Sequence, residues 1–470
     1  MRYVSTRGRT PAAGFERVLL EGLARDGGLY VPEAWPSLDE AEIAALAGLP
    51  YWRAAARVAA PFLDDGVDGE RFADLARDAY AVFDHPAAAP LRQLGDNDWL
   101  LELFHGPTFA FKDYALQLLG RLFDDLLGRI GRRITIVGAT SGDTGSAAIE
   151  ACRGRRSIEI FILHPEGRVS EVQRRQMTTV TDDNVHNIAI EGTFDDCQHL
   201  VKAMFNDPAF RDELDLSAVN SINWVRVMAQ IVYYATAAVA LGAPRRAVAF
   251  VVPTGNFGDV FAGYAALRMG LPIARLVVAT NRNDIVARFL ATGEYRRGEV
   301  APTMSPSMDI QVASNFERLL FDLLDRDGAR VSERMESFAR DGAFTLGDEA
   351  MAEVRRRFTG RRIDEAETAA ALRRTWEGAG VLVDPHTAVG LAAARTCRTG
   401  GADAIPAEVP LVTLATAHPA KFPEAVERSC GVRPEAPPAL ARVFERPERY
   451  TVLPVDLDRV QRHIREHTPP

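Results

Sequence analysis

The chain has 470 residues, of which 47% are hydrophobic and 25% are charged, and its formal net charge is −9. This length suits two or three domains with a sizeable core, and the acidic balance argues against nonspecific nucleic-acid binding, which needs a basic surface. Four scattered cysteines without a CxxC pair argue against a structural zinc site, and the lack of an apolar leader or a membrane-length apolar run predicts a soluble cytoplasmic protein.

The first 90 residues have the pattern of short helices separated by proline and glycine. Residues 39–49 and 70–83 have helical patterns, and Pro86 and Pro90 with the small residues between them indicate a boundary. We therefore expect a mainly helical N-terminal segment over residues 1–90.

Beyond residue 90, short β-branched runs alternate with amphipathic helical runs. Strands are predicted at residues 134–137, 158–163, 248–252, 276–279 and 411–414, and a helix is predicted at residues 260–268. Strands that alternate with helices at this spacing favour parallel sheets with helices on both faces. The length and two glycine-rich turns predict two such α/β lobes, over residues 91–220 and 221–470, and the lobes are free to exchange segments.

A lysine lies at the start of a predicted helix that has one wide apolar stripe. The stripe consists of Tyr114, Ala115, Leu118, Leu119, Leu122, Phe123, Leu126 and Leu127. Beside Phe109 and Phe111, the charge of Lys112 is disfavoured by desolvation unless it is lost or paired. A Schiff base to a carbonyl cofactor is one use of such a lysine, and a side chain that reaches solvent is the alternative.

Two glycine-rich turns each join a predicted strand to a helix. Residues 138–146 follow the strand at 134–137, and residues 253–259 follow the strand at 248–252. Backbone N–H groups at such a turn, aided by the helix dipole, bind a phosphate or a carboxylate. The first turn lacks the lysine of a P-loop, and a tight turn that needs small residues is the alternative reading. Two such turns together suit a phosphorylated cofactor and an anionic substrate.

A further candidate, Thr416, lies directly after the predicted strand at 411–414. Ligands of open α/β sheets gather at the carboxyl ends of strands. The hydroxyl of Thr416 could face a ring nitrogen of a ligand, or the residue could be purely structural.

Nine short segments follow one another in a specific order along the chain. They are residues 2–8 (RYVSTRG), 103–108 (LFHGPT), 110–113 (AFKD), 139–145 (ATSGDTG), 191–198 (EGTFDDCQ), 255–259 (GNFGD), 306–310 (PSMDI), 385–388 (PHTA) and 416–419 (TAHP). Each could arise by chance, but in this order they are highly specific. Together they resemble the threonine synthase family, in its longer bacterial and fungal type.

This resemblance implies the fold of the tryptophan synthase β chain, in which two α/β lobes hold pyridoxal 5′-phosphate (PLP) between them, here with an additional N-terminal segment. It implies that Lys112 is the catalytic residue and bonds to the cofactor, and that Thr416 faces the pyridine nitrogen. The cup for the cofactor phosphate would consist of Gly255, Asn256, Phe257, Gly258 and Asp259. No metal ion is expected.

The resemblance also implies conversion of O-phosphohomoserine and water into threonine and phosphate, the last step of threonine biosynthesis. The predicted substrate-binding residues are Ser141, Gly142, Asp143, Thr144 and Arg226. The turn at 141–145 would receive the α-carboxylate, although many relatives of this fold have Asn where Asp143 lies beside the cofactor's 3′-oxygen. Arg226 is the first candidate for the leaving phosphate, because guanidinium binds phosphate bidentately, ahead of Lys421, Arg168 and His105.

Two other functions remain open at this point. A lyase with the same cofactor and fold would release phosphate from the same substrate and yield 2-oxobutyrate, but the segments at 191–198 and 306–310 favour the synthase. A noncatalytic module could bind phosphorylated ligands through the two turns, but Lys112 in its motif argues against it. The sequence does not indicate an oligomeric state.

Overall fold

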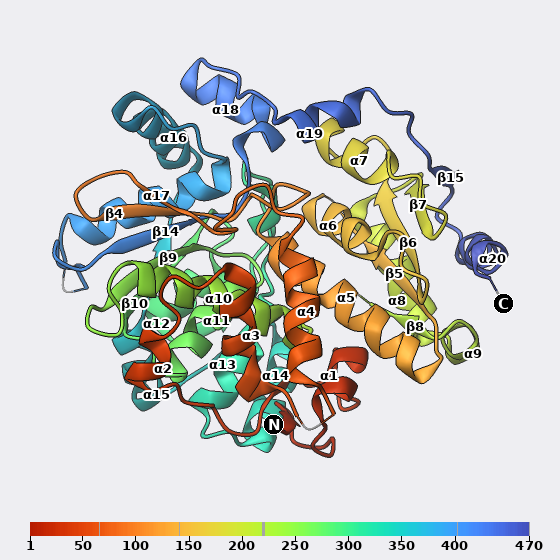
Figure 1. Ribbon diagram of the computed structural model, residues 1–470, viewed down its shortest axis with the longest axis horizontal. Coiled ribbons are helices and arrows are strands. Elements are labelled where there is room, and N and C mark those ends of the chain that lie inside the picture. Colours follow the sequence, from red (N-terminus) through yellow and green to blue (C-terminus); the bar gives the residue numbers. More distant parts are fainter. Residues whose placement is uncertain (65, 141, 219–220, 402, 470) are drawn as a thin grey trace.

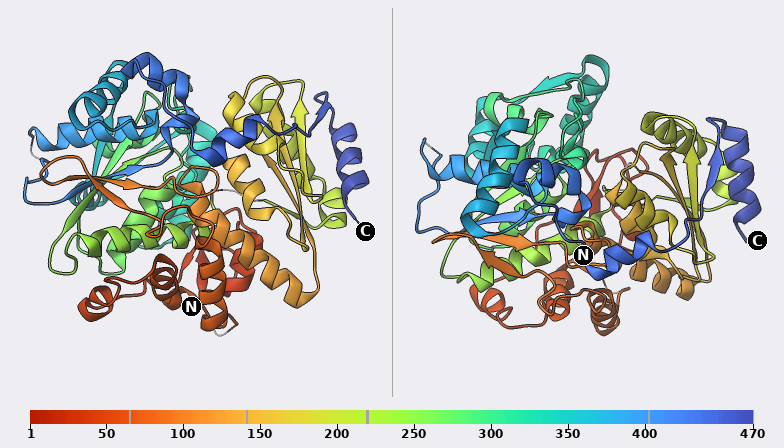
Figure 2. Two further views of the ribbon diagram at one scale, coloured as in Figure 1. Left: turned by 45° about the horizontal axis from the view of Figure 1, so that its top comes forward. Right: turned by 90° about the horizontal axis from the view of Figure 1, so that it is seen from above.

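The computed structural model describes residues 1–64, 66–140, 142–218, 221–401 and 403–469. Two α/β lobes lie side by side, and the N-terminal segment packs along one side of them (Figures 1 and 2). This arrangement confirms the predicted fold class of two parallel-sheet lobes with a mainly helical N-terminal segment. Within the described ranges, every helix is too short or too polar to cross a membrane.

The N-terminal segment supports one helix of each lobe. Its elements are β1 (Tyr3–Ser5), α1 (Phe15–Glu21), β2 (Tyr30–Pro32), α2 (Glu40–Ala44), α3 (Tyr51–Ala59), η1 (Ala60–Phe62) and α4 (Gly69–Tyr80). Helix α3 packs against α10 (Trp224–Ala240), and α4 packs against α5 (Lys112–Ile130). The rings of Tyr3 and Phe62 lie against Trp224, at the start of α10. The segment therefore braces the helices that carry Lys112 and Arg226.

The larger lobe is built on a six-stranded sheet with the order β13-β10-β9-β14-β4-β3. The strands are β3 (Leu91–Gln93), β4 (Asp98–Glu102), β9 (Val248–Pro253), β10 (Ile273–Thr280), β13 (Phe358–Arg362) and β14 (Leu411–Ala415). All neighbours pair in parallel except β3, which is antiparallel to β4 at the edge. The strands predicted at 248–252, 276–279 and 411–414 are thus confirmed, each somewhat longer than expected.

Helices cover both faces of this sheet, which separates two apolar cores. Besides α10, the elements of this lobe are α11 (Gly258–Arg268), α12 (Ile285–Thr292), β11 (Glu294–Arg296), η2 (Pro306–Met308), α13 (Phe316–Leu323), α14 (Gly328–Asp341), β12 (Ala343–Thr345), α15 (Asp348–Arg357), α16 (Glu365–Ala379), α17 (Pro385–Arg398), η3 (Pro419–Lys421) and α18 (Pro423–Cys430). Helices α16 and α17 pack on one face, and α10 and α11 pack on the other. Loops at the carboxyl ends of the strands are left free to form a site.

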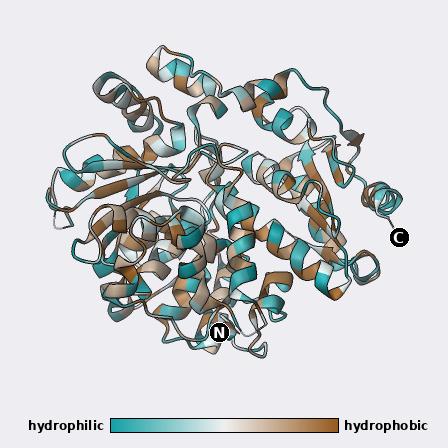
Figure 3. Cartoon of the chain, in the orientation of Figure 1, coloured by the Kyte–Doolittle hydropathy of each residue, from teal (hydrophilic) through white to brown (hydrophobic). Residues whose placement is uncertain are grey.

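The smaller lobe is built on a five-stranded parallel sheet with the order β15-β7-β6-β5-β8. Its strands are β5 (Ile134–Ala139), β6 (Ile158–Pro165), β7 (Val185–Ile190), β8 (Leu216–Ser217) and β15 (Thr451–Leu453). Besides α5, the lobe contains α6 (Asp143–Cys152), α7 (Glu171–Thr178), α8 (Phe194–Asn206), α9 (Pro208–Glu213), α19 (Pro438–Ala441), η4 (Arg442–Phe444) and α20 (Leu457–His467). Figure 3 shows the hydrophobic central strands, and every residue of β6 is buried, as expected for a strand covered on both faces.

Both sheets contain segments that are distant in sequence. Strands β3 and β4 precede α5 but lie in the larger sheet, and β15 follows the larger lobe but lies in the smaller sheet. In Figure 2 the C-terminal segment runs from the larger lobe across to the smaller one. The lobes are therefore joined by several crossings of the chain.

Candidate active site

A cavity of about 760 Å³, which includes space open to solvent, is lined by residues of both lobes. Lys112, Asp143 and Thr144 come from the smaller lobe, and residues 254–260 and Thr416 come from the larger lobe. The larger-lobe residues directly follow β9 and β14, at the strand ends where ligands of parallel sheets bind.

Three helices that begin at this cavity, α5, α6 and α11, have no cap from the side chain of their own N-cap residue. At α6 the hydroxyl of Thr140 instead accepts from the N–H groups of Gly142 at 3.1 Å and Gly145 at 3.0 Å, which leaves the N–H groups of residues 143 and 144 toward the cavity. The first N–H groups of an uncapped helix have no partner within the helix, and the helix dipole adds positive potential there. At the start of α11, Phe257 has a left-handed φ of 63°, and a Cβ atom on Gly255 would lie 2.9 Å from the carbonyl oxygen of Ser307. This turn therefore forms a tight backbone cradle that suits a phosphate group.

Lys112 is the first residue of α5 and is 9% exposed. Its Nζ lies 3.6 Å from Oδ2 of Asp143 and 4.8 Å from the centre of the Phe111 ring. Burial lowers the pKa of Lys112 below its ordinary value, and the charge of Asp143 opposes this shift. A buried amine that loses its proton readily is suited to bond to a carbonyl carbon.

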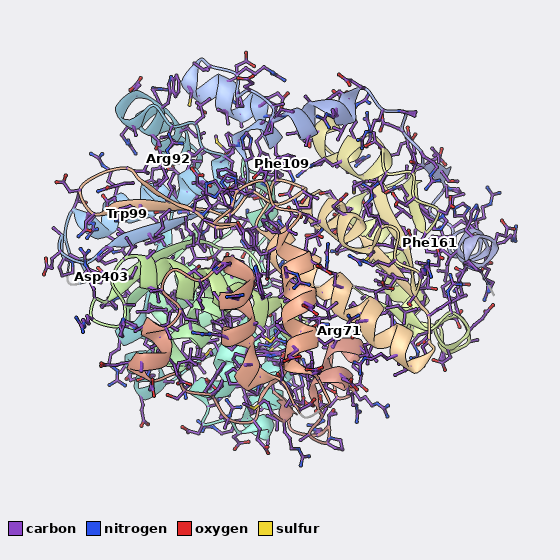
Figure 4. All side chains as sticks on the ribbon, viewed as in Figure 1. Arg71, Arg92, Trp99, Phe109, Phe161 and Asp403 are labelled. Atoms are coloured by element: carbon purple, nitrogen blue, oxygen red, sulfur yellow. The ribbon has the colours of Figure 1, made fainter. Side chains whose placement is uncertain are left out.

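Backbone hydrogen bonds fix the loop before Lys112 to the strand end at Thr416. The N–H of Phe111 donates to the carbonyl of Thr416 at 2.9 Å, and the N–H of His418 donates to the carbonyl of Phe109 at 3.0 Å. In the view of Figure 4, Phe109 appears between Trp99 and Phe161, and it packs with Val172 of α7 in the smaller lobe and Ala420 of η3 in the larger lobe. The two lobes thus meet at the lysine.

The carboxylate of Asp143 lies among hydrogen-bond donors. Its Oδ1 accepts from Nζ of Lys421 and from Nε2 of Gln173, both at 2.8 Å. Burial alone would raise the pKa of Asp143, but the charges of Lys421 and Lys112 and these hydrogen bonds hold it far below its ordinary value. Asp143 is therefore ionised, and its other oxygen lies toward Lys112.

Arg226 is 5% exposed and lines the cavity. Its Nη1 has no hydrogen-bond partner among the described residues. Burial lowers the pKa of Arg226 to about 10, which still leaves the side chain charged at neutral pH. An unpaired buried cation is costly, so an anion in the cavity would stabilise it.

Asp259, in the first turn of α11, has different surroundings from Asp143. Its Oδ1 accepts from the hydroxyls of Tyr233 at 2.5 Å and Tyr234 at 2.9 Å, and its Oδ2 has no partner among the described residues. Burial raises the pKa of Asp259 to about 6, although the tyrosine hydrogen bonds and the charge of Lys112 oppose this rise. Its backbone, rather than its carboxylate, is the part suited to hold a phosphate.

The structure brings nearly all of the predicted site residues together. The cavity is lined by Lys112, Asp143, Thr144, Arg226, Gly255, Asn256, Phe257, Gly258, Asp259 and Thr416. Gly142 is buried at the N-cap of α6, and Ser141 lies outside the described residues. The alternative phosphate ligands His105 and Arg168 do not line the cavity: His105 lies between Asp84 and Glu102, and Arg168 is exposed.

Some residues of the site had no role in the sequence-based interpretation. Gln173 contacts Asp143, and His386 lines the cavity with its Nδ1 2.6 Å from Asp384 and its Nε2 accepting from the N–H of Ser307 at 3.1 Å. The segment at 385–388 contained His386 but did not show what it contacts, and no local pattern marks Gln173.

Three family models match the chain. They are threonine synthase N terminus at residues 2–80, pyridoxal-phosphate dependent enzyme at residues 84–352, and threonine synthase, C-terminal at residues 387–464. The chain belongs to the threonine synthase family. The middle match also makes it a member of the PLP-dependent enzymes. The predicted family and cofactor are therefore confirmed.

Full-length relatives and solved structures agree with this membership. The threonine synthase of Pseudomonas aeruginosa is 56% identical over 468 residues, which cover 99% of this chain and 98% of that protein. The PLP-bound threonine synthase from Brucella melitensis is 52% identical, with a TM-score of 0.97 over 100% of both chains. The threonine synthase from yeast is 38% identical, with a TM-score of 0.94 over 99% of this chain and 98% of that one.

The described residues include no group of three or more His, Cys, Asp or Glu side chains that could hold a metal ion. The charged groups of the site are instead arranged around the cavity of Lys112.

Proposed function

We propose that the protein converts O-phosphohomoserine and water into threonine and inorganic phosphate in the cytoplasm, as the last step of threonine biosynthesis. Given that the chain belongs to this family, one observation supports the proposal. The buried amine of Lys112 and the guanidinium of Arg226, whose Nη1 has no partner among the described residues, line the same cavity as the starts of α6 and α11. One cavity thus offers an amine and several anion sites, which suits a carbonyl cofactor with a phosphate and a substrate with two anionic ends.

The residues present fit PLP. Lys112 would bond to its carbonyl carbon, and the backbone N–H groups of residues 255–259 would hold its phosphate. The hydroxyl of Thr416 would face the pyridine nitrogen. A hydroxyl stabilises a protonated ring less than a carboxylate does, so Thr416 would limit how strongly the ring withdraws electrons.

When bound, PLP supplies an electron sink for negative charge that forms next to the substrate's amino group. The freed Lys112 amine takes a proton from Cα and then one from Cβ, while the phosphate leaves Cγ. Lys112 then returns one of these protons at Cγ, the hydroxyl of water adds at Cβ, the other proton returns to Cα, and the remaining proton of the water leaves with the phosphate. The lowered pKa of Lys112 favours the unprotonated amine that these steps need.

We propose separate ligands for the two anionic ends of the substrate. The turn at 141–145, at the start of α6, would bind the α-carboxylate. Arg226 would bind the leaving phosphate, because a guanidinium matches a phosphate and its Nη1 has no hydrogen-bond partner among the described residues. The ionised Asp143 would repel a carboxylate, so we assign its side chain to holding Lys112.

We also propose that residues 1–90, 91–220 and 221–470 are the functional units of the chain: a brace, the lobe with Lys112 and the lobe with the phosphate turn. Strands β3, β4 and β15 cross between the sheets of the last two units. Exchanged segments of this kind would hold the two halves of the site in a fixed relative position.

The test is product analysis with the PLP-loaded protein and O-phosphohomoserine, with Lys112→Ala as the matched control. We expect equal amounts of threonine and phosphate from the wild type and neither product from the variant. Phosphate accompanied by 2-oxobutyrate would contradict the synthase reaction and indicate a lyase. The absence of both products would contradict the substrate assignment.

A further inference from the structure

Lys421 lies behind Asp143 and does not line the cavity. Its side chain is 0% exposed, and its Nζ donates to Oδ1 of Asp143 at 2.8 Å and to the carbonyl of Thr108 at 2.7 Å. A fully buried ammonium is costly unless it is paired and hydrogen-bonded, and these two contacts supply both. Lys421 is therefore a buried ammonium whose charge is paired inside the protein.

The composition of the chain makes this lysine conspicuous. Of the 55 lysine and arginine residues, 52 are arginines, and the lysines are Lys112, Lys202 and Lys421. Two of these three lysines therefore contact the same carboxylate, that of Asp143. An ammonium is compact and has three donors, whereas a guanidinium is planar and has five. The enclosed space beside Asp143 and Thr108 thus suits an ammonium.

Lys421 connects segments from both sides of the site. It ends η3, which follows β14 of the larger sheet, whereas Asp143 begins α6 in the smaller lobe. Thr108 lies in the loop before Lys112, and both its N–H and its hydroxyl donate to Asp113, the neighbour of Lys112, at 2.8 and 2.7 Å. One ammonium therefore fixes the carboxylate that faces Lys112 and the loop that leads into it.

The contact between Lys421 and Asp143 affects the pKa of Lys112 through the charges around it. The charged or titratable groups that face Lys112 are Asp143 on α6, Lys421 on η3, Arg226 on α10, Asp259 on α11 and His386 on α17. The charge of Asp143 raises the pKa of Lys112, while the charges of Lys421 and Arg226 lower it. Asp143 also lies between Lys421 and Lys112, so loss of Lys421 leaves a full negative charge beside Lys112.

We propose that Lys421 is a positioning residue, which orients Asp143 and offsets its negative charge and thereby sets how readily the nitrogen of Lys112 keeps its proton. The proposal rests on the proposed function only for the identity of the group bound at Lys112. Lys421 does not line the cavity, so it would act through Asp143.

The test uses a double-mutant cycle of the PLP-loaded protein: wild type, Lys421→Met, Asp143→Asn and the combination of both. Lys202→Met is the matched control, because Lys202 is exposed on α8. The first measurement is the thermal unfolding midpoint. The second is the pH at which the visible absorbance of the bound cofactor titrates, which reports the proton on the nitrogen of Lys112.

We expect Lys421→Met to lower the unfolding midpoint by about 5 °C or more, because one member of a buried ion pair is left alone. It should raise the absorbance midpoint by about 1 pH unit, since a cation near Lys112 is lost, and Asp143→Asn should lower it by a similar amount. The double variant, which restores the net charge, should recover most of both changes. Lys202→Met should behave as wild type.

A double variant no more stable than Lys421→Met, or an absorbance midpoint that Lys421→Met leaves unchanged, would overturn the proposal. If Lys421→Met does not fold, the double variant carries the test, and its failure to fold also overturns the proposal. The unfolding cycle does not depend on the reaction, so it separates this proposal from the proposed function. A wild-type spectrum that Lys112→Ala leaves unchanged would instead contradict the proposed function.

Discussion

The turns at the starts of α6 and α11 have the same local construction, but the pKa values of their carboxyl groups are shifted in opposite directions. Each joins a parallel strand to a helix whose N-cap residue gives no side-chain cap and whose first turn contains an acidic residue. At α6, two lysines hold the pKa of Asp143 far below its ordinary value. At α11, burial among tyrosines raises the pKa of Asp259 to about 6.

The difference arises from residues outside the turns. Lys421 and Gln173 surround Asp143, and Tyr233 and Tyr234 bind Asp259. A strand–glycine–helix pattern therefore predicts where an anion binds through the backbone, but tertiary contacts decide the charge beside it. Substituting the charged residues and the glycines one at a time tests whether backbone anion binding and the neighbouring charge are independent.

Lys112→Ala should have the largest effect, because Lys112 is the cation that faces both turns. We expect kcat to fall by about 10³-fold or more, as for loss of a group that transfers protons, and the cofactor absorbance to change to that of unlinked PLP. Product assays and spectra measure both effects. The exposed Lys202→Ala is the control, and near-normal turnover by Lys112→Ala would refute the assignment.

Arg226→Met should weaken binding of the substrate phosphate but leave binding of the cofactor phosphate unchanged. We expect KM for the phosphorylated substrate to rise about 10²-fold, in line with loss of a charged bidentate contact, while the Kd of PLP stays the same. Stability should not decrease, because the substitution removes a buried cation whose Nη1 has no partner in the described part of the chain. Steady-state kinetics and PLP titration measure these constants, with the exposed Arg282→Met as the control. An unchanged KM would exclude Arg226 as the phosphate ligand.

Replacing one glycine of each turn by alanine should lower the affinity for PLP by different amounts. A Cβ atom on Gly255 would lie 2.9 Å from the backbone carbonyl of Ser307, whereas one on Gly142 would lie 2.6 Å from the side-chain amide of Gln173. A side chain rotates away more easily than a backbone moves. PLP titration should therefore show an affinity loss of about tenfold for Gly255→Ala and a smaller loss for Gly142→Ala. The reverse order would contradict the assignment of the α11 turn to the cofactor phosphate.

Asp259→Asn should have the smallest effect, and the effect should depend on pH. The pKa of Asp259 is raised from 3.8 to about 6 in the folded protein. Its ionisation therefore costs stability progressively as the pH rises from about 4 through 6. Asparagine keeps an acceptor for both tyrosines without this charge, so the variant should equal wild type near pH 4 and be more stable by up to about 3 kcal/mol at pH 7.

Urea unfolding at the two pH values measures this difference. Asp259→Ala is the control, because it leaves both tyrosine hydroxyls unpaired and should be less stable at either pH. A stability gain for Asp259→Asn that is the same at pH 4 and pH 7 would contradict the ionisation described here.

Local patterns predicted the strands β5, β6, β9, β10 and β14, but not β3, β4, β7, β8, β13 or β15. β6 and β9 are largely apolar runs slightly longer than predicted, and Lys112 begins a helix whose predicted stripe is buried. The helix expected at residues 39–49 is shorter, because α2 ends at Ala44 and the chain turns at Gly48 with a left-handed φ of 69°. Glycine near a helix end is ambiguous in sequence, since it is tolerated within a helix and also ends one.

The partners of the charged site residues could not be predicted in the same way. Lys421 is 278 positions from Asp143 in the numbering of the chain and meets it only because η3 and α6 come together in the fold. The pairing of His386 with Ser307 likewise depends on packing between α17 and η2. The scarcity of lysine was the one compositional sign that Lys421 is unusual.

The position of β15 has a consequence for how the protein folds during its synthesis. β15 (Thr451–Leu453) covers the outer edge of β7, and α20 then packs on the same apolar core as β6. During synthesis on the ribosome, β7 therefore has an unpaired edge until residues 451–453 have been translated. Exposed strand edges pair with other chains. A nascent chain that lacks residues 451–453 is thus expected to aggregate through β7 and to need a chaperone until they have been translated.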